Sequence, residues 1–250
     1  MIESIKANVG LDILIPVYNE EHISDLFQLL QSEVVTPFRV LLCYDSSSDK
    51  TLSSFSKEDY NFEIKEVKNQ GKGVHSAIMT GFSVSEAYAV VVYPADDILN
   101  TNILDSMYNQ CISGSDVVVA SRFIKGGSMK NCPLLKEILV RLGSLSLYSL
   151  SCIPVMDASN GFRLFSNSYL KSVFIESSKG FTYSIELLVK ARRLRLNISE
   201  IPAQWEERLH GSSRFNISGW IFSYLKWYLY GLATFWLRKG PQTVERIHRI

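Results

Sequence analysis

Two adjacent carboxylates, Asp96 and Asp97, stand directly after an apolar run at residues 89–93 and Pro94. The run is rich in β-branched valine, which predicts a buried strand that delivers both acids to the edge of a sheet. Carboxylate oxygens suit a hard divalent cation, and Mg²⁺ is usually held by one or two protein carboxylates together with substrate phosphates. The alternative for an isolated Asp-Asp pair is a strand followed by a solvated acidic turn.

The chain around this run alternates between strand-like and helix-like patterns. Apolar runs predict strands at residues 11–17, 39–44, 62–67, 89–93 and 116–121, and apolar residues at helical spacing predict helices at 20–33 and 73–84. Such β-α-β alternation predicts an α/β fold with a mostly parallel sheet and right-handed crossovers.

Polar clusters follow three of these strands, at residues 16–20, 44–49 and 94–97. In open α/β sheets, ligands bind beyond the carboxyl ends of the strands. Asp45 and Asp49 taken singly are explained equally well as turn and cap residues. Because three such loops converge on one rim, we expect a ligand crevice there.

The composition fits one large α/β domain as well as two small ones, because 250 residues with 46% hydrophobic content can bury a full core. A net charge of +1 gives no electrostatic footprint for nucleic acid, which we exclude as a partner. Residues 1–10 lack an apolar targeting core. Scattered cysteines without metal-ligand spacing indicate reduced thiols in a cytoplasmic protein: Cys43, Cys111, Cys132 and Cys152.

Seven short motifs occur between residue 11 and about residue 216, in the order LIPVYNEE, YDSSSDKT, QGKGVHSAIMTGF, YPADD, VVVASRF, NGFRLF and ERLHGSSRF. Together they resemble the family 2 inverting glycosyltransferases, and within them the dolichyl-phosphate mannose synthase group. The resemblance implies a three-layer nucleotide-diphospho-sugar transferase fold and a divalent metal, Mg²⁺ or Mn²⁺. It also implies transfer of a hexosyl group from a nucleotide-sugar donor to a polyprenyl phosphate acceptor.

The resemblance assigns residues to the nucleotide-sugar donor. Carboxylates and an aromatic ring suit the hydrogen-bonding groups and the flat face of a base and its ribose. Lys72 stands at a predicted helix start, where backbone N–H groups favour an anionic ligand. The residues that match those holding the base and ribose are Pro16, Tyr18, Glu20 and Asp45.

Ala95 and Asp96 match the latter part of the family's metal-binding Asp-x-Asp motif, whose first aspartate is here Pro94. Asp96 therefore becomes the principal metal ligand, and Asp97 points elsewhere if the chain is extended at this place. We expect the site to depend more on substrate phosphates and waters, which still satisfy an octahedral ion.

Arginines are expected to supply the remaining phosphate chemistry. Arg122 follows the strand at 116–121, and Arg208 and Arg214 match two cations that in the family contact the nucleotide diphosphate. Guanidinium groups bind phosphate oxygens in pairs and stay charged at any working pH. The segment that carries Arg208 and Arg214 is predicted to close over the donor. We assign catalysis to Asp96, Arg122 and Arg208.

The acceptor requires no general base. A phosphate monoester has a second pKa of about 6 and is largely dianionic at neutral pH. The candidate bases, Asp157 and Glu186, carry no strong signal. Direct in-line attack by the acceptor phosphate on the anomeric carbon is the simplest mechanism, and it predicts inversion.

Two apolar segments are candidates for a membrane surface. Residues 133–153 form either a core helix or an interfacial helix, and Lys136 falls where the family has an arginine for the acceptor phosphate, although Val140 replaces a nearby family serine. Residues 219–237 are rich in Trp and Tyr and are interrupted by Lys226, which favours an in-plane anchor on the cytoplasmic leaflet over a span or a core helix. We divide the chain into a transferase domain, 1–216, and an anchor segment, 217–250.

Three functions are compatible with these patterns. The first is a polyprenyl-phosphate glycosyltransferase that uses a donor of the GDP-mannose or UDP-glucose type. The second is a family member that glycosylates a saccharide or lipid hydroxyl. The third is an inactive nucleotide-sugar-binding protein whose metal motif has decayed at Pro94. The sequence leaves the sugar, the base and the oligomeric state open.

Overall fold

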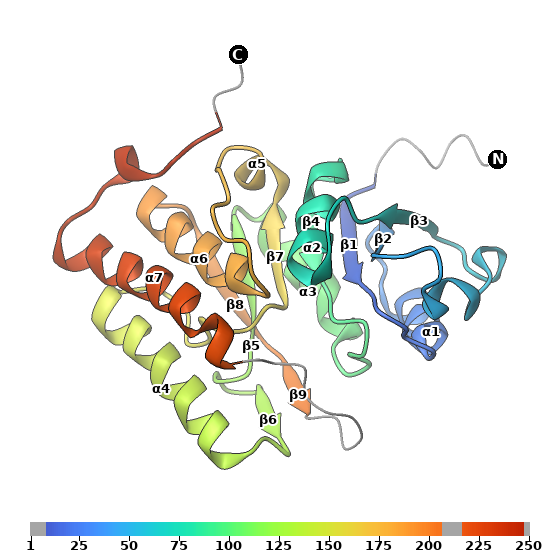
Figure 1. Cartoon of the computed structure of the whole chain (residues 1–250), viewed down its shortest axis with the longest axis horizontal. Coiled ribbons are helices and arrows are strands. Elements are labelled where there is room, and N and C mark those ends of the chain that lie inside the picture. Colours follow the sequence, from blue (N-terminus) through green and yellow to red (C-terminus); the bar gives the residue numbers. More distant parts are fainter. Residues whose placement is uncertain (1–8, 207–216, 248–250) are drawn as a thin grey trace. The chain divides into compact units, whose positions relative to one another are not determined.

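The computed structural model of the chain describes residues 9–206 and 217–247 (Figure 1). The chain forms two compact units. The first unit contains the chain up to Ser113 together with Phe162–Lys171, and the second contains Gly114–Gly161 together with the chain from Ser172 onward.

The first unit is built on strands in the spatial order β3-β2-β1-β4-β7. β1 pairs in parallel with both β2 and β4, β2 pairs in parallel with β3, and β7 pairs antiparallel with β4. The bounds of these strands are β1 Leu11–Pro16, β2 Phe38–Tyr44, β3 Glu63–Lys68, β4 Ala89–Val92 and β7 Arg163–Ser166. The mostly parallel α/β architecture predicted from the sequence is confirmed for this unit.

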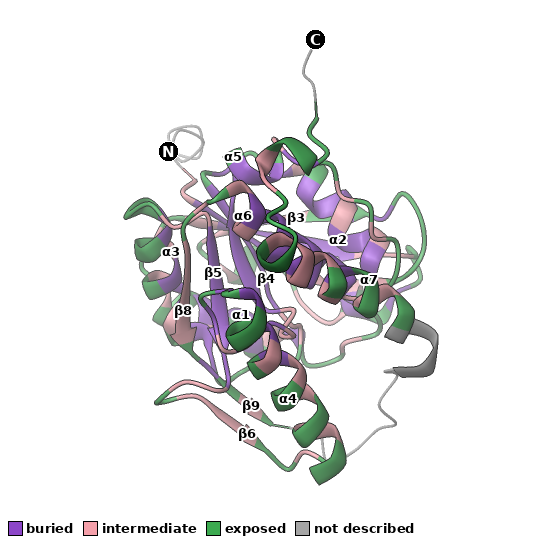
Figure 2. Ribbon diagram, turned by 90° about the vertical axis from the view of Figure 1, so that its left-hand side faces the viewer, coloured by how far each residue is buried: buried purple, intermediate pink, exposed green. Residues whose placement is uncertain are grey.

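Helices cover these strands, so β1, β2 and β4 are buried almost along their whole length (Figure 2). In α1 the residues Ile23, Leu26, Phe27 and Leu30 share one buried face at helical spacing. The helices of the first unit are α1 Ile23–Glu33, α2 Gly73–Val84, α3 Leu104–Ile112 and α5 Asn167–Leu170, with short 3-10 helices η2 Lys50–Ser53, η3 Lys57–Asp59 and η4 Thr101–Ile103.

The predicted and observed elements of the first unit agree closely, and α2 has the predicted bounds, Gly73–Val84. The helix predicted from Glu20 begins instead at Ile23, because the backbone N–H of Glu20 donates to Thr51 Oγ1 at 2.9 Å and belongs to a loop. β7 was not predicted, since its sequence RLFS lacks the run of β-branched residues that marks the equally short β4.

The described residues of the second unit form two strand pairs and three longer helices. β5 pairs in parallel with β8, and β6 pairs in parallel with β9. The bounds are β5 Val117–Ser121, β6 Ser128–Lys130, β8 Ile198–Pro202, β9 Gln204–Glu206, α4 Leu134–Ser151, α6 Thr182–Leu194, α7 Ile217–Trp236 and the 3-10 helix η5 Pro241–Thr243. The strand predicted at 116–121 and the helix predicted at 133–153 are therefore confirmed.

α7 packs against both α4 and α6 within the second unit (Figure 1). Gly231 makes the close approach possible, because an added Cβ would lie 3.2 Å from both Leu147 Cδ2 and Val189 Cγ1. Trp227 is buried at the same contact. The described part of the segment predicted as an anchor, 217–250, thus belongs to this unit, and the division of the chain after residue 216 stays a prediction.

Polar contacts fix α7 to α6. Lys190 is fully buried on α6, and its Nζ lies 2.7 Å from Glu186 Oε1 and 2.8 Å from Glu176 Oε1. Glu176 also accepts from Lys226 of α7 at 2.9 Å. Arg193 donates to the carbonyl of Tyr230 at 2.7 Å. Since each buried charge has partners, the desolvation cost of burying it is offset.

The outer surfaces of α4 and α7 carry exposed apolar side chains. Leu134 and Leu135 of α4 are each 71% exposed, and Phe222 of α7 is 79% exposed. Neither helix, nor any other within the described residues, is long and apolar enough to cross a membrane. Of the apolar residues of α4, Leu147 is buried, whereas most of the others are exposed, namely Leu134, Leu135, Ile138, Leu139, Leu142, Leu145, Tyr148 and Leu150.

We expect Gly81→Ala in α2 to lower the free energy of unfolding by about 1–3 kcal/mol, because the new methyl group overpacks the interior. A Cβ at Gly81 would lie 2.3 Å from Leu14 Cδ1 and 3.0 Å from Cys43 Sγ. Urea denaturation followed by circular dichroism measures the loss.

Gly143→Ala is the matched control, because a Cβ at Gly143 in α4 would meet nothing within 4 Å. Alanine favours a helix interior over glycine by about 1 kcal/mol, so this variant should be unchanged or more stable. Equal losses in both variants would contradict the close contact at Gly81.

Candidate functional site

The loop after β1 is held by the segment that follows β2. Asn19 adopts a left-handed backbone conformation, with φ 56°, which asparagine tolerates better than most residues. Its N–H donates to Asp49 Oδ1 at 2.9 Å, and its own Oδ1 accepts from the N–H of Lys50 at 3.1 Å. Together with the bond from Glu20 N–H to Thr51 Oγ1, these contacts fix the loop.

This loop carries three of the residues predicted to hold the base and ribose of a nucleotide. The side chain of Tyr18 is 54% exposed, while Pro16 and Glu20 are half-buried. Tyr18 and Glu20 flank Asn19. Because the backbone of Asn19 is held by its hydrogen bond to Asp49, the backbone positions from which the two side chains project are fixed as well. The arrangement presents an aromatic ring and a carboxylate at the carboxyl end of β1.

Asp49 has a structural role. It caps η2 by accepting from the N–H and the Oγ1 of Thr51, at 2.9 and 2.6 Å, and it is buried. Of the two acids that the sequence left open between capping and binding, Asp49 is therefore the cap.

Asp45 lies at the end of β2 and contacts the turn that begins α2. Its Oδ1 accepts from Asn69 Nδ2 at 2.6 Å, and its Oδ2 accepts from the N–H of Gly73 at 2.8 Å. Lys72 is exposed and occupies the N-cap position of α2, as predicted from the sequence. Asp45 and Lys72 are thus brought to one place in the first unit.

The two acids after β4 have different environments. The N–H of Asp97 donates to the carbonyl of Pro94 at 3.2 Å, which closes a turn over Ala95 and Asp96. Asp97 accepts from Leu99 N–H at 2.9 Å, and its two oxygens lie 2.9 and 2.7 Å from Asn100 Nδ2. Burial raises the pKa of Asp97, and these hydrogen bonds oppose that rise.

Asp96 is exposed and Ala95 is half-buried at the centre of the same turn. The chain is not extended here, so the alternation of a strand does not apply, and the turn separates the two carboxylates. The carboxylate of Asp97 stabilises its own loop, so Asp96 is the acid left at the surface of this turn.

No group of three or more His, Cys, Asp and Glu side chains that could hold a metal occurs within residues 9–206 and 217–247. Asp96 offers a single carboxylate. Mg²⁺ and Mn²⁺ accept such a donor set when the substrate phosphates and waters supply the other oxygens. The residues present therefore fit a divalent ion that binds together with a nucleotide, whose phosphates supply further oxygen ligands.

Arg122 is buried at the end of β5 in the second unit and bonds to Asp157. Its Nε lies 2.7 Å from Asp157 Oδ2, its Nη2 lies 2.9 Å from Asp157 Oδ1, and Nη2 also donates to Ser159 Oγ at 2.8 Å. This forked geometry is the strong form of the ion pair. These bonds use Nε and Nη2 and do not involve Nη1.

The two candidate bases are both engaged in buried contacts of the second unit. Asp157 is fully buried and accepts from Arg122. Glu186 is fully buried and accepts from Lys190 Nζ and from the N–H groups of Glu176 and Ser177, each at 2.7 Å. Neither carboxylate is available to take a proton from an acceptor in this arrangement.

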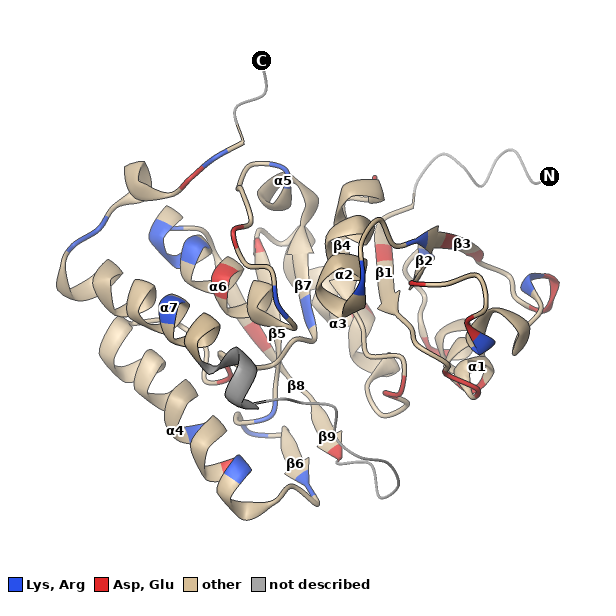
Figure 3. Ribbon diagram, in the orientation of Figure 1, with Lys and Arg blue, Asp and Glu red and all other residues tan. Residues whose placement is uncertain are grey.

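Basic side chains gather on α4 and beside it (Figure 3). Lys136 is half-buried, with Nζ 5.0 Å from the centre of the Trp205 ring. The ring of Phe123 lies 5.1 Å from the Arg122 guanidinium and 4.9 Å from that of Arg141. Cations held over aromatic faces keep a defined position.

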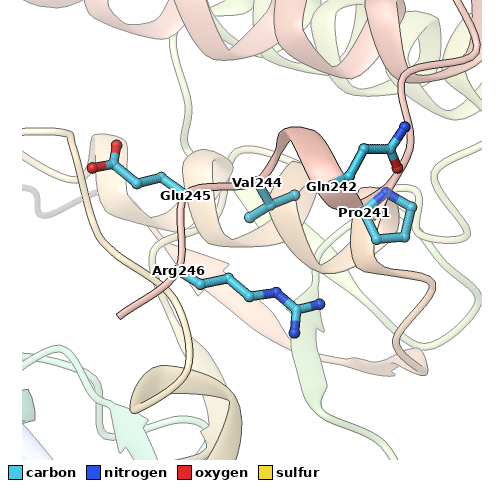
Figure 4. Close-up of a pocket in the computed structure, with 5 residues that line it drawn as sticks. All are labelled: Pro241, Gln242, Val244, Glu245 and Arg246. Carbon is cyan, nitrogen blue, oxygen red and sulfur yellow. The ribbon is translucent and has the colours of Figure 1, made fainter. Parts of the chain in front are cut away.

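The two other predicted arginines, Arg208 and Arg214, lie outside the described residues. The pocket shown in Figure 4 is lined by other residues of the second unit, namely Pro241, Gln242, Val244, Glu245 and Arg246. None of the predicted site residues lines this pocket, so it is not the candidate site.

The thiols give no sign of cysteine chemistry. Burial raises the pKa of the Cys43 thiol to about 12, which keeps it protonated at neutral pH. No disulfide joins the four cysteines, all of which lie in the described part of the chain. They are consistent with the reduced thiols expected from their spacing.

The model of the family described as "Glycosyl transferase family 2" matches residues 12–174. This chain belongs to glycosyl transferase family 2. The match includes the loops after β1, β2 and β4 and the Arg122–Asp157 pair. The family predicted from the sequence motifs is confirmed.

Curated relatives of this family 2 chain span most of its length. A dolichol-phosphate mannosyltransferase of Pyrococcus furiosus is 24% identical over 87% of this chain, which covers 64% of that protein's length. A dolichyl-phosphate beta-glucosyltransferase of Trichomonas vaginalis is 28% identical over 86% of this chain and 71% of its own. A polyprenol monophosphomannose synthase of Mycolicibacterium smegmatis is 23% identical, with 88% and 87% covered.

A solved structure of glucosyl-3-phosphoglycerate synthase from Mycobacterium tuberculosis, in complex with Mn²⁺, UDP and glucosyl-3-phosphoglycerate, has the same fold. It matches with a TM-score of 0.64 at 16% identity, over 93% of this chain and 83% of that one. The predicted nucleotide-diphospho-sugar transferase fold is therefore confirmed for the family 2 chain.

Several partners of the site residues were missed by the sequence analysis. Asn69 had a local signal, because an asparagine two residues before a glycine favours a turn in which its side chain binds the backbone, as the 3.0 Å bond from Gly71 N–H shows. The pairing of Arg122 with Asp157 had no local sequence signal, since 35 positions separate the two residues.

We expect Asp157→Ala to lower the free energy of unfolding by about 3–5 kcal/mol, because it leaves the buried Arg122 without its carboxylate. Equilibrium denaturation in urea measures this change.

The control is Glu137→Ala, which removes the surface partner of Arg141 at 3.0 Å, a contact worth at most about 0.5 kcal/mol. A loss below about 1 kcal/mol in Asp157→Ala would show that the buried pair is not needed.

Proposed function

We propose that this chain is an inverting glycosyltransferase that moves a hexosyl group from a nucleotide sugar to a polyprenyl phosphate. Family membership supports the sugar transfer, and the relatives named for dolichol and polyprenol phosphate support the acceptor class. The chain spans 64% of the length of the first of these relatives, so the activity is proposed from the part that is matched.

The observation that carries this proposal is the surface of the second unit. This surface holds cations at Lys136 and Arg141 and exposes the apolar side chains of α4 and α7. A polyprenyl phosphate combines an anionic group with a long hydrocarbon chain. A free sugar hydroxyl as acceptor would use neither property.

The donor is assigned to the loops of the first unit. Pro16 and the exposed ring of Tyr18 suit the flat face of a base, while Glu20 and Asp45 can accept from its N–H groups and from ribose hydroxyls. Lys72 at the start of α2 suits the negative charge of the donor. GDP-mannose and UDP-glucose are the donor types that we propose.

Asp96 would hold the divalent ion, with Ala95 beside it in the turn. Mg²⁺ or Mn²⁺, when bound, neutralises charge on the departing nucleoside diphosphate. Arg122 keeps one nitrogen, Nη1, outside its bonds to Asp157 and Ser159, and we assign it to phosphate. We give the same role to Arg208 and Arg214, which lie outside the described residues.

The reaction proceeds without a protein base in this proposal. The acceptor phosphate attacks the anomeric carbon as a dianion, the bond from that carbon to the diphosphate breaks, and the configuration inverts. The engagement of Asp157 with Arg122 and of Glu186 with Lys190 supports this mechanism.

Membrane association is part of the proposal. The exposed leucines of α4 and the exposed aromatic residues of α7 would lie in the interface of a bilayer, with Lys136 and Arg141 near lipid phosphates. We propose that the enzyme associates peripherally with the cytoplasmic face of a membrane.

The test of the proposed reaction uses the purified chain, Mg²⁺ or Mn²⁺, labelled GDP-mannose or UDP-glucose, and undecaprenyl phosphate. We expect label in the organic phase that mild acid releases, because a glycosyl phosphate is acid-labile. Label found on a saccharide or lipid hydroxyl instead supports the second function. Donor binding without any transfer supports the inactive binding protein.

Asp96→Asn should reduce turnover at least about a hundredfold in the same assay, because it removes the carboxylate assigned to the metal. Asp97→Asn is the matched control, since its amide can still accept from Leu99 N–H and the change should mainly lower stability. Full activity in Asp96→Asn would remove this residue from the metal site.

The double variant Leu135→Ser with Leu139→Ser should bind phosphatidylglycerol vesicles at least about tenfold more weakly than the wild type, since two exposed leucines would leave the bilayer. Vesicle sedimentation measures this affinity.

Val35→Ser is the control, because Val35 is 86% exposed in the first unit, away from α4 and α7 in the chain. A wild-type protein that ignores vesicles would refute the anchor, as would equal effects of the two changes.

A further inference from the structure

Asn69 is a buried amide at the carboxyl end of β3, and it contacts two of the segments assigned to the donor. It is 7% exposed. Its Nδ2 donates to Asp45 Oδ1 at 2.6 Å, and the carbonyl oxygen of Gly73 lies 3.3 Å from the same nitrogen. Its Oδ1 accepts from Gly71 N–H at 3.0 Å and from Ser76 Oγ at 2.7 Å. One side chain thus joins β2, the turn at 69–73 and α2.

The turn at 69–73 is built around this amide. An added Cβ at Gly71 would lie 2.3 Å from Ser76 Oγ, so the close approach that completes the network requires glycine. Gly73 has φ +80°, a conformation that glycine adopts without strain. Asn69 is also fixed through its backbone, since its N–H donates to the carbonyl of Tyr44 at 2.8 Å.

Both oxygens of Asp45 are oriented by this network. One accepts from Asn69 Nδ2 and the other accepts from Gly73 N–H. An ionised carboxylate has about four lone-pair positions, so these two bonds leave capacity for a ligand. The same turn carries Lys72 at the start of α2.

We propose that Asn69 is a positioning residue for nucleotide binding: it sets the orientation of Asp45 and the shape of the turn that carries Lys72. The inference rests on the proposed function, because it takes Asp45 and Lys72 as donor-binding residues. It extends that function, because it assigns part of the control over donor binding to a side chain that need not contact the donor.

Asn69→Asp separates positioning from bulk stability, because it keeps the size of the side chain and replaces its donor by a carboxylate. Two carboxylates at the 2.6 Å separation of this contact cannot both ionise without repulsion, and such a pair shares one proton with a raised apparent pKa. At about pH 5 the shared proton restores the bond to Asp45. At about pH 9 the repulsion displaces Asp45.

Calorimetric titration with GDP-mannose and with UDP-glucose, in the presence of Mn²⁺, measures the effect on the dissociation constant. For Asn69→Asp we expect an affinity about tenfold weaker than the wild type at about pH 9 and within about twofold of it at about pH 5. For Asn69→Ala we expect a loss of about tenfold at both pH values, since no proton can restore a donor. The other titratable groups of β2, β3, the turn and α2 are the same in every variant, so their effects cancel when each variant is compared with the wild type at the same pH; they are Arg39, Cys43, Tyr44, Glu63, Lys65, Glu66, Lys68, Lys72 and His75.

Asn167→Ala is the control for a merely structural effect. Asn167 is a buried amide of the same unit, and its Nδ2 bonds to the carbonyl oxygens of Ser85 and Ala87 at 3.1 and 2.8 Å. Its loss should lower the thermal midpoint and leave donor affinity unchanged. Thermal midpoints are measured for every variant, and where Asn69→Asp unfolds below about pH 9, the comparison uses the highest pH at which it is folded.

Wild-type affinity in Asn69→Ala overturns the positioning role. So does a ratio of the Asn69→Asp dissociation constant to the wild-type constant that does not change with pH. An equal loss of affinity in Asn167→Ala also overturns it, because the effect would then follow stability. If the wild type binds neither nucleotide sugar, the proposed function fails and the inference fails with it.

Discussion

The parallel pairing of β1 with β2 and β4 is the constraint on which the candidate site depends. Because the strands run the same way, their carboxyl ends meet at one edge, and the loops that carry Tyr18, Asp45 and Asp96 start there. The pairing is stabilised by burial of apolar residues on both faces and by one satisfied buried charge, Asp12. This carboxylate accepts from Arg39 Nε at 2.9 Å and from Ser85 Oγ at 2.8 Å, so its burial carries a reduced cost.

The carboxylates near the candidate site differ in their hydrogen-bond partners and their exposure. Asp49, Asp97 and Asp157 are each occupied by several donors of their own unit, and each fixes a loop or an arginine. Asp96 stands exposed in a turn, and Asp45 is half-buried with two bonds. A buried carboxylate needs such partners, whereas one that binds a cation or a nucleotide must keep capacity for it. This physical difference is the reason why Asp45 and Asp96 are proposed as ligand-binding acids and Asp49, Asp97 and Asp157 are not.

In the second unit, contacts between helices hold α7 in place. α6 contacts α7 through Lys190, whose Nζ lies 4.9 Å from the centre of the Trp227 ring, and through Arg193, which donates to the carbonyl of Tyr230. Gly231 lets α7 approach α4 closely. These contacts use one side of the helix and leave large apolar side chains on the other. Large exposed apolar surfaces are rare on soluble monomers and mark surfaces of interaction. The proposed lipid acceptor would use both the apolar exposure and the cations of the same unit.

The family and the parallel α/β fold follow from the sequence by itself, because short motifs and apolar runs are local signals that survive without tertiary information. The positions of Pro16, Tyr18, Asp45, Lys72 and Asp96 at strand ends and a helix start follow in the same way. What the tertiary structure decided were the partners: Asn69 with Asp45, Asp49 with Asn19, and Arg122 with Asp157, at separations of 24, 30 and 35 positions. A hydrogen bond needs atoms within about 3 Å in a defined direction, and no local pattern encodes which distant side chain will meet that condition.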